Sequence, residues 1–237
     1  MKKRGSKNAY GHLEMIIAFT LFVGFVGFLV IFVRPSDNST LSDSVATALK
    51  DSFLDSVKTN YTRFFVSIKS SSSDSCFSID LDERTFKYPS TGGFVERAID
   101  GARVDSKIDP EYKITANSGK GSYYVSISPE FDTSGVTSFT CSLGTDYALG
   151  SIDEKNLVSR KGLDEIKGRY ENDYNSLRAE LGLPVTFDFA IVSDDLPEIN
   201  MDLAVPDNSE VVAVEASDDV LFSDGEVRSV RFIFKVW

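Results

Sequence analysis

Histidine is nearly absent from this chain of 237 residues, which contains only His12. A histidine is the usual general base beside a catalytic serine or cysteine, so neither pair can form in the long region that follows. Glycine patterns that bind phosphate are also missing, since no stretch matches Gly-x-x-x-x-Gly-Lys-Ser/Thr or a dinucleotide fingerprint. The sequence therefore predicts a protein that is not an enzyme and binds no cofactor.

Basic side chains are in the minority: 25 Lys and Arg stand against 36 Asp and Glu, a net charge of −11. Binding to phosphate backbones needs a cationic surface, which excludes nucleic acid as the main partner. Acidic pairs such as Asp194-Asp195 and Asp218-Asp219 are common, but no spacing matches the Asp-x-Asp-x-Asp-Gly loop that holds calcium. We interpret most of them as solvated surface and predict no metal site, with a calcium site or a hydrolytic acid pair as the alternatives.

Charge is missing altogether from residues 15–33, where nineteen consecutive residues are uncharged and Thr20 carries the only hydroxyl group. As a helix, this segment would be about 28 Å long, close to the thickness of the hydrocarbon core of a bilayer. A buried helix of a globular protein would instead show polar residues at regular spacing. The segment therefore predicts a transmembrane helix in contact with membrane lipid.

Basic residues lie mainly on one side of the apolar segment. Only Arg34 follows it closely, whereas four basic residues precede it: Lys2, Lys3, Arg4 and Lys7. The positive-inside rule then predicts a single-pass protein of the cell membrane with a cytoplasmic N-terminus and an extracellular C-terminal domain. Residues 35–237 contain 20 basic and 35 acidic side chains, a net charge of −15. Because no small-x-small site follows the long apolar stretch closely, an uncleaved anchor is favoured over a secretory signal peptide.

Two residues beside the apolar segment point to a family. Gly11 ends the basic head, and Glu14 stands directly before the uncharged run. Residues 2–33 thereby resemble the start of archaeal type IV pilin-like proteins with class III signal peptides. The resemblance implies that a prepilin peptidase cuts between Gly11 and His12, and that the apolar helix then serves as an anchor or packs against other pilin-like subunits. It also implies that Glu14 offsets the amine of a neighbouring subunit; the alternative is an interfacial carboxylate at the positive end of the helix dipole.

Apolar spacing divides the rest of the chain into helices and strands. A stripe from Leu41 to Val57 predicts one helix, and a second helix over 163–181 ends at Gly182 and Pro184. Runs typical of strands lie at 63–68, 111–116, 122–128, 136–143, 185–192, 201–205, 211–216 and 227–236. The second and third of these runs flank a glycine-containing turn and predict a hairpin. The predicted fold class is α+β: an N-terminal transmembrane helix followed by an extracytoplasmic head of mixed helix and antiparallel sheet.

The predicted domain organisation has four parts. These are a cytoplasmic basic head at 1–12, a transmembrane helix at 13–34, a membrane-proximal helix at 35–60 and an α+β head at 61–237 that divides into two subdomains near residue 150. The predicted function is that of a cell-surface, pilin-like structural subunit. The alternative is a membrane-tethered envelope or binding protein that does not assemble. Cleavage after Gly11, detected by N-terminal sequencing, would favour the structural subunit over this alternative.

Cys76 and Cys141 are the only cysteines, and both lie in predicted strands. No histidine lies near them in sequence, so a zinc site is not expected. We predict a disulfide, which would close a loop of about 65 residues and stabilise the fold by about 3–5 kcal/mol, with two free buried cysteines as the alternative. Two triplets, Asn38-Ser39-Thr40 and Asn60-Tyr61-Thr62, match the acceptor pattern for N-glycosylation.

Overall fold

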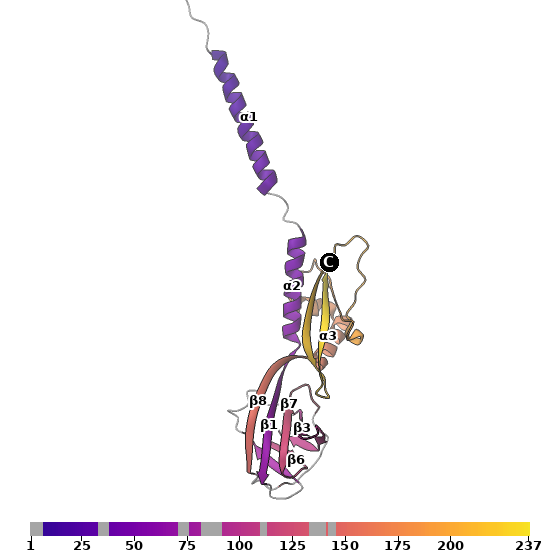
Figure 1. Cartoon of the computed structure of the whole chain (residues 1–237). Helices are drawn as coiled ribbons and strands as arrows, with labels where there is room; N and C mark the ends of the chain where they lie inside the picture. Colours follow the sequence, from indigo (N-terminus) through magenta and orange to yellow (C-terminus); the bar gives the residue numbers. More distant parts are fainter. Residues whose placement is uncertain are drawn as a thin grey trace, which may run out of the picture. The chain divides into compact units, whose positions relative to one another are not determined.

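The described residues fold mainly into β strands. The computed structural model describes residues 7–32, 38–70, 76–81, 92–109, 113–132, 141 and 146–237. The chain divides into two compact units, Met1–Ser44 and Val45–Trp237. The first unit contains α1 (Lys7–Phe32), and the second contains both β sheets (Figure 1). The four predicted domain ranges and the division near residue 150 stay predictions.

Eight strands form the larger sheet, in the order β4-β3-β7-β1-β8-β10-β11-β9. Neighbouring strands are antiparallel except β8 and β10, which pair in parallel at Val158 and Val220. The strands of this sheet are β1 (Lys58–Ser70), β3 (Gly93–Arg97), β4 (Arg103–Val104), β7 (Gly121–Ile127), β8 (Asp146–Ser159), β9 (Phe189–Val192), β10 (Val212–Leu221) and β11 (Val227–Val236). A smaller sheet, in the order β2-β6-β5, consists of β2 (Phe77–Asp80), β5 (Ser106–Ile108) and β6 (Lys113–Ala116).

The strands β9, β10 and β11 pack against helices. The helices are α2 (Asn38–Ser56), α3 (Arg160–Asn172), α4 (Tyr174–Glu180) and the short 3-10 helix η1 (Pro197–Ile199). Phe53 of α2 is fully buried, and its ring centroid lies 5.6 Å from that of Phe234 and 6.5 Å from that of Phe232, both on β11. Leu163 of α3 and Leu177 of α4 belong to the same hydrophobic cluster. This cluster is the core of one half of the second unit.

The strands β1, β3 and β7 pack instead with the smaller sheet. Along β1, Phe64, Val66 and Ile68 are buried in this second core. Because successive side chains of a strand point to opposite faces, the residues between them, Arg63 and Phe65 included, lie on the other face and are half-buried. That other face of β1 is where the pocket described below is found.

The prediction of a transmembrane helix is wrong for the part of the chain that the structure describes. No helix among these residues is long and apolar enough to cross a membrane. α1 covers Lys7–Phe32, and Lys7 and Glu14 are charged residues within it. Residues 33 and 34, at the end of the predicted span 13–34, lie outside the described residues. The predicted single-pass location, with a cytoplasmic N-terminus and an extracellular C-terminal domain, is therefore not supported.

The predicted α+β fold class is also wrong, because strands dominate the described residues. The main reason is β8, a strand of 14 residues that the sequence pattern did not predict. Residues 149–156 of this strand are all exposed, so no alternation of apolar and polar residues marks it. Its partner β1 has 13 residues and extends beyond the predicted range 63–68 on both sides.

Several local predictions also need correction. The predicted hairpin is wrong, because β6 lies in the smaller sheet and β7 in the larger one. The predicted helix over 163–181 is interrupted at Asp173, whose φ of −147° and ψ of 53° are not helical. In the predicted strand 201–205 only Met201 forms a bridge, to Ile191. Most of the predicted strand 136–143 lies outside the described residues.

Candidate functional site

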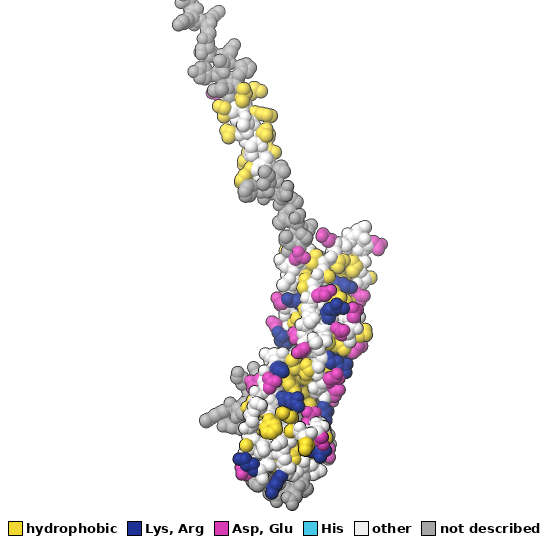
Figure 2. All heavy atoms as spheres, in the orientation of Figure 1, with side chains coloured by type: hydrophobic (Ala, Val, Ile, Leu, Met, Phe, Trp, Pro, Cys, Tyr) yellow, Lys and Arg dark blue, Asp and Glu magenta, His cyan; other side chains and the backbone are white. Residues whose placement is uncertain are grey.

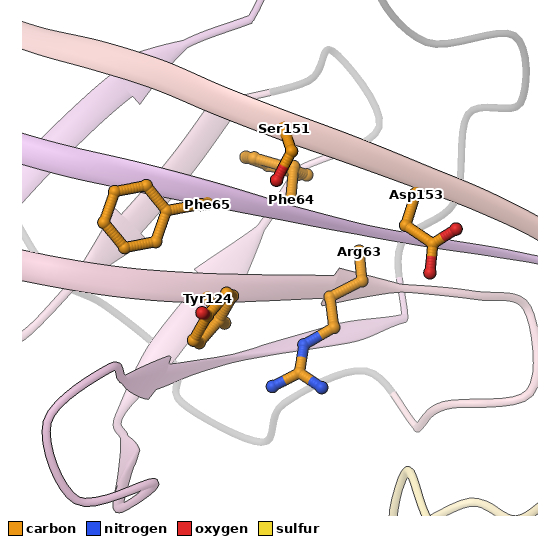
Figure 3. Close-up of a pocket in the computed structure, with 6 residues that line it drawn as sticks. All are labelled: Arg63, Phe64, Phe65, Tyr124, Ser151 and Asp153. Carbon is orange, nitrogen blue, oxygen red and sulfur yellow. The ribbon is translucent and has the colours of Figure 1, made fainter.

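A surface pocket of about 300 Å³ lies on three adjacent strands of the larger sheet, β1, β7 and β8 (Figure 3). It is lined by Arg63, Phe64, Phe65, Tyr124, Ser151 and Asp153. The rings of Phe65 and Tyr124 lie toward one end of the pocket, and the guanidinium of Arg63 and the carboxylate of Asp153 lie toward the other (Figure 3). The pocket therefore combines an apolar end with a polar end.

Strand register brings these side chains together. On β1, Phe65 is paired with Tyr124 of β7, and Arg63 is paired with Asp153 of β8. The ring centroids of Phe65 and Tyr124 lie 5.5 Å apart in an edge-to-face contact. Such aromatic pairs across a sheet stabilise the register that forms them. The two rings are thus held in place before any ligand binds.

A β-bulge between β1 and β8 lies beside Phe65. The register shifts between Phe64 and Val66, so that Gly150 and Ser151 of β8 both lie opposite Phe65. A Cβ atom at position 150 would lie 2.9 Å from Cδ1 of Phe65, closer than side chains normally approach. Glycine at this position therefore lets β8 pass close to the ring, and the bulge turns Ser151 toward the pocket.

Arg63 is held by few contacts. Its Cζ atom lies 4.5 Å from the centroid of the Tyr124 ring, within the range of a cation–π interaction. Its Nη2 atom lies 3.4 Å from Oε2 of Glu96, longer than the usual 2.7–2.9 Å of a charge-assisted hydrogen bond. Its Nε atom is buried and has no hydrogen-bond partner among the described residues. The guanidinium therefore keeps donor capacity for a ligand at the pocket.

A second polar cluster lies at the start of α3. Glu130 is 1% exposed, and its carboxylate accepts hydrogen bonds from the backbone N–H of Lys161, at 3.0 Å, and from the hydroxyl group of Ser159. The Ser159 hydroxyl in turn accepts from the N–H of Gly162, at 2.8 Å, and caps α3. Burial raises the pKa of Glu130, and the hydrogen bonds from Ser159 and Lys161 oppose this rise. The cluster links the turn after β7 to α3.

Replacing Glu130 with glutamine is expected to change how stability depends on pH. A carboxyl group whose pKa is raised by folding binds its proton more tightly in the folded state, so wild-type stability should fall as pH rises from the ordinary glutamate value through the raised one. E130Q lacks this group and should show a flatter decline. Thermal unfolding followed by circular dichroism between about pH 4 and 7 measures the difference.

Glu226 provides the matched control for this experiment. It is exposed, and its hydrogen bond with Arg228 lowers its pKa, so its contribution to stability is lost as pH falls, the opposite sign. The stability of E226Q should therefore still fall as pH rises, as it does in wild type, whereas the stability of E130Q should fall less. Parallel curves for wild type and E130Q would show that burial of Glu130 does not control the pH dependence.

The acidic pairs singled out in the sequence have structural partners. Asp195 accepts a hydrogen bond from the backbone N–H of Arg231 at 2.8 Å, and Asp194 lies 3.4 Å from the Arg231 guanidinium. Asp218 accepts from the N–H of Asp219 at 2.8 Å. Among the described residues, no three His, Cys, Asp or Glu side chains are grouped so that they could hold a metal ion.

None of the residues predicted from the sequence as sites is among those that line the pocket. Cys76 and Cys141 form a disulfide, with their Cα atoms 6.1 Å apart. Glu14 is exposed on α1, and the backbone of Gly11 and His12 belongs to the same helix, although their side chains lie outside the described part. Asn38 is the first residue of α2, and Asn60 is a half-buried residue of β1. Their predicted roles in processing, assembly and glycosylation stay predictions.

Sequence reasoning did not find the pocket. Arg63 and Phe65 were placed in a predicted strand, and Tyr124 in another, but no pattern indicated that these strands are neighbours. Ser151 and Asp153 belong to the unpredicted strand β8. The one available signal was the aromatic Phe65 on the face of β1 opposite its buried residues. The comparisons found no family model, curated protein or solved structure that matches this chain.

Proposed function

We propose that this protein is a structural subunit that assembles with copies of itself through α1, and that the assembly carries the β-rich unit Val45–Trp237. The observation that supports the proposal is the exposed apolar surface of α1. Large hydrophobic side chains between Met15 and Phe28 are 40–72% exposed. Figure 2 shows these side chains in yellow along the helix.

The size of this surface favours burial in an assembly. Soluble monomers rarely expose contiguous apolar patches of more than a few hundred Å². Each large apolar side chain that moves from water into a packed interface contributes about 1.5–3 kcal/mol. Exposed residues occur all around α1, for example the successive residues Met15, Ile16 and Ile17, so one neighbouring helix would not cover them. Several helices packed together would.

A second copy of the same chain is the partner that best fits the exposed surface of α1. The described side chains from Met15 to Phe28 carry no charge, so they offer no ion pair to a charged partner helix. Identical helices bury identical surfaces, which is the commonest arrangement in soluble oligomers. A Cβ atom added at Gly24 or Gly27 would meet nothing within 4 Å, which leaves room for the close approach of a neighbouring backbone. The resemblance to pilin-like proteins supports the same arrangement, with Glu14 beside the amine of a neighbour.

Sedimentation velocity of the purified full-length chain tests the proposal. Wild type should form assemblies that contain many copies, and the double variant F19E/F22E should sediment as a monomer, because two charges cannot be buried among apolar helices without a partner. Far-UV circular dichroism should show that the β-rich unit of the variant is unchanged. I99E is the matched control, since Ile99 is 92% exposed in the β-rich unit and its replacement should leave assembly intact.

Two results would overturn the proposal. One is a wild-type chain that remains a monomer, or that is recovered only as single copies bound to detergent micelles. The other is unchanged assembly of F19E/F22E. N-terminal sequencing of the assembled protein addresses the predicted cleavage between Gly11 and His12 separately, because assembly through residues 15–28 does not require it.

A further inference from the structure

We propose that the pocket on β1, β7 and β8 binds a sugar ring of a neutral oligosaccharide. This inference does not rest on assembly through α1, because every residue that lines the pocket belongs to the unit Val45–Trp237. It rests on three properties of the pocket: an aromatic end, a polar end with donors and acceptors, and charges of both signs.

The aromatic end suits the apolar face of a sugar. Tyr124 is 36% exposed, and its edge-to-face contact with Phe65 fixes both rings at the surface. A pyranose ring presents several C–H groups on one face, and these pack favourably on the electron-rich face of an aromatic ring. Ligand pockets generally combine such apolar walls with a few placed polar groups. The Phe65 ring and the part of the Tyr124 ring that Arg63 does not cover would provide the wall here.

The polar end suits the hydroxyl groups at the edge of the sugar. A hydroxyl group donates one hydrogen bond and accepts others, so it pairs with donors and acceptors alike. Arg63 offers donors only, Asp153 accepts only, and Ser151 can do both. Ser151 lies between the Phe65 ring and Asp153, and Arg63 lies across the pocket from them (Figure 3). Adjacent hydroxyl groups of one sugar could therefore be bound at the same time.

The charges of the pocket favour a neutral ligand. The charged groups at the pocket are already paired: Glu96 lies between Arg63 and Arg103, at 3.4 Å and 3.7 Å from them, and Asp153 lies 3.1 Å from Nζ of Lys155. A charged ligand of either sign would have to compete with these ion pairs for Arg63 or Asp153. An uncharged polyhydroxylated ligand avoids this competition.

Arg63 has bonding capacity that such a ligand would use. Its long contact with Glu96 and its buried, unpartnered Nε atom leave the guanidinium poorly satisfied. A buried donor without a partner is unfavourable, so a small movement of the side chain toward a ligand hydroxyl costs little. The pocket volume of about 300 Å³ is at the lower end for ligand sites, which favours a single sugar ring of a longer chain.

Binding of defined oligosaccharides to the full-length chain tests the inference. The probes are neutral oligomers of glucose, galactose, mannose and N-acetylglucosamine, each at up to about 1 mM, the weak end of the affinity scale, with binding followed by NMR saturation transfer and calorimetry. At least one neutral oligomer should bind. Its affinity should fall at least tenfold, which corresponds to about 1.4 kcal/mol, in Y124A and in R63A.

Conservative variants separate binding from folding. Y124F keeps the aromatic wall and should bind like wild type, whereas R63K keeps the charge but loses the planar donor fork and should bind more weakly. L149A is the matched control, because Leu149 is 37% exposed on β8 but does not line the pocket. Thermal unfolding of every variant checks that it is folded.

The inference is overturned if no neutral oligomer binds, if sulfated oligosaccharides bind as tightly as neutral ones, or if Y124A that is folded binds like wild type. None of these outcomes depends on assembly. A chain that binds sugar as a monomer would contradict the proposed function alone, and an assembly that binds no sugar would contradict this inference alone.

Discussion

Replacing Phe53 with alanine is expected to lower the free energy of unfolding by about 3–5 kcal/mol. Phe53 is fully buried where α2 meets β11, and its ring contacts those of Phe232 and Phe234. Truncation removes the apolar area of the ring and leaves a cavity between rigid partners, which relax only partly. Since small domains are stable by about 5–15 kcal/mol, this loss is a large fraction of the total.

Urea denaturation followed by circular dichroism measures the effect of F53A. The matched control on the same helix is L41A, because Leu41 is 58% exposed and its truncation should change stability by no more than about 0.5 kcal/mol. A loss of less than about 1 kcal/mol in F53A would contradict the packing of α2 on β11.

Removing the disulfide is the second change with a large expected effect. The double variant C76S/C141S should unfold with a free energy lower by about 3–5 kcal/mol. The bond links residues 65 apart in sequence, and the loop between them contains the smaller sheet together with β3, β4 and β7 of the larger one. Without the bond, the unfolded chain regains the conformational freedom of this loop, which favours unfolding.

Denaturation with and without a reducing agent gives an internal control. Reduction should destabilise wild type to about the level of C76S/C141S and should leave the double variant unchanged. Mass spectrometry after alkylation reports the bond directly, since the intact disulfide blocks both thiols. Equal unfolding midpoints for oxidised wild type and the double variant would contradict a stabilising role for the bond.

Amphipathic segments were the most predictable part of the fold. The predicted strand 227–236 is confirmed as β11, because Val230, Phe232, Phe234 and Val236 alternate with more exposed residues and all four are buried. The stripe that begins at Leu41 correctly predicts α2, since Leu49 and Phe53 lie on the face that packs against the sheet. In both cases one face of the element is buried, and the regular spacing of apolar residues in the sequence identifies that face.

Strand pairing was not predictable in the same way. The turn between β6 and β7 suggested that the two strands pair with each other, yet β6 pairs with β2 and β5, and β7 with β1 and β3. A turn signal depends only on the residues of the turn, whereas pairing depends on which distant strands offer a matching buried face. Tyr123 and Val125 of β7 are buried together with Phe64 and Val66 of β1, far away in sequence.

The uncharged N-terminal run shows a further limit of sequence patterns. Composition alone predicted a membrane span, but no helix in the described part of the chain is both long and apolar enough to be one. The part of the prediction that holds is the helix itself. α1 begins with polar residues, is apolar after them, and exposes large side chains from Met15 onward. Exposure of this kind, and not the hydrophobic run alone, supports the proposal of assembly.

The sequence by itself determined the acidic character of the chain, its lack of a catalytic histidine pair in the region after His12, its amphipathic helix and strands, and the presence of just two cysteines that could pair. All of these depend on composition or on local periodicity. The tertiary structure alone decided the order of the eight strands, the long pairing of β1 with the polar strand β8, and the pocket between Phe65, Tyr124, Arg63 and Asp153. These features arise where residues distant in sequence share a register. Burial of a common apolar face selects the register of β1 and β7, whereas β8 is held by its backbone pairing with β1 and by its buried end at Leu157 and Val158.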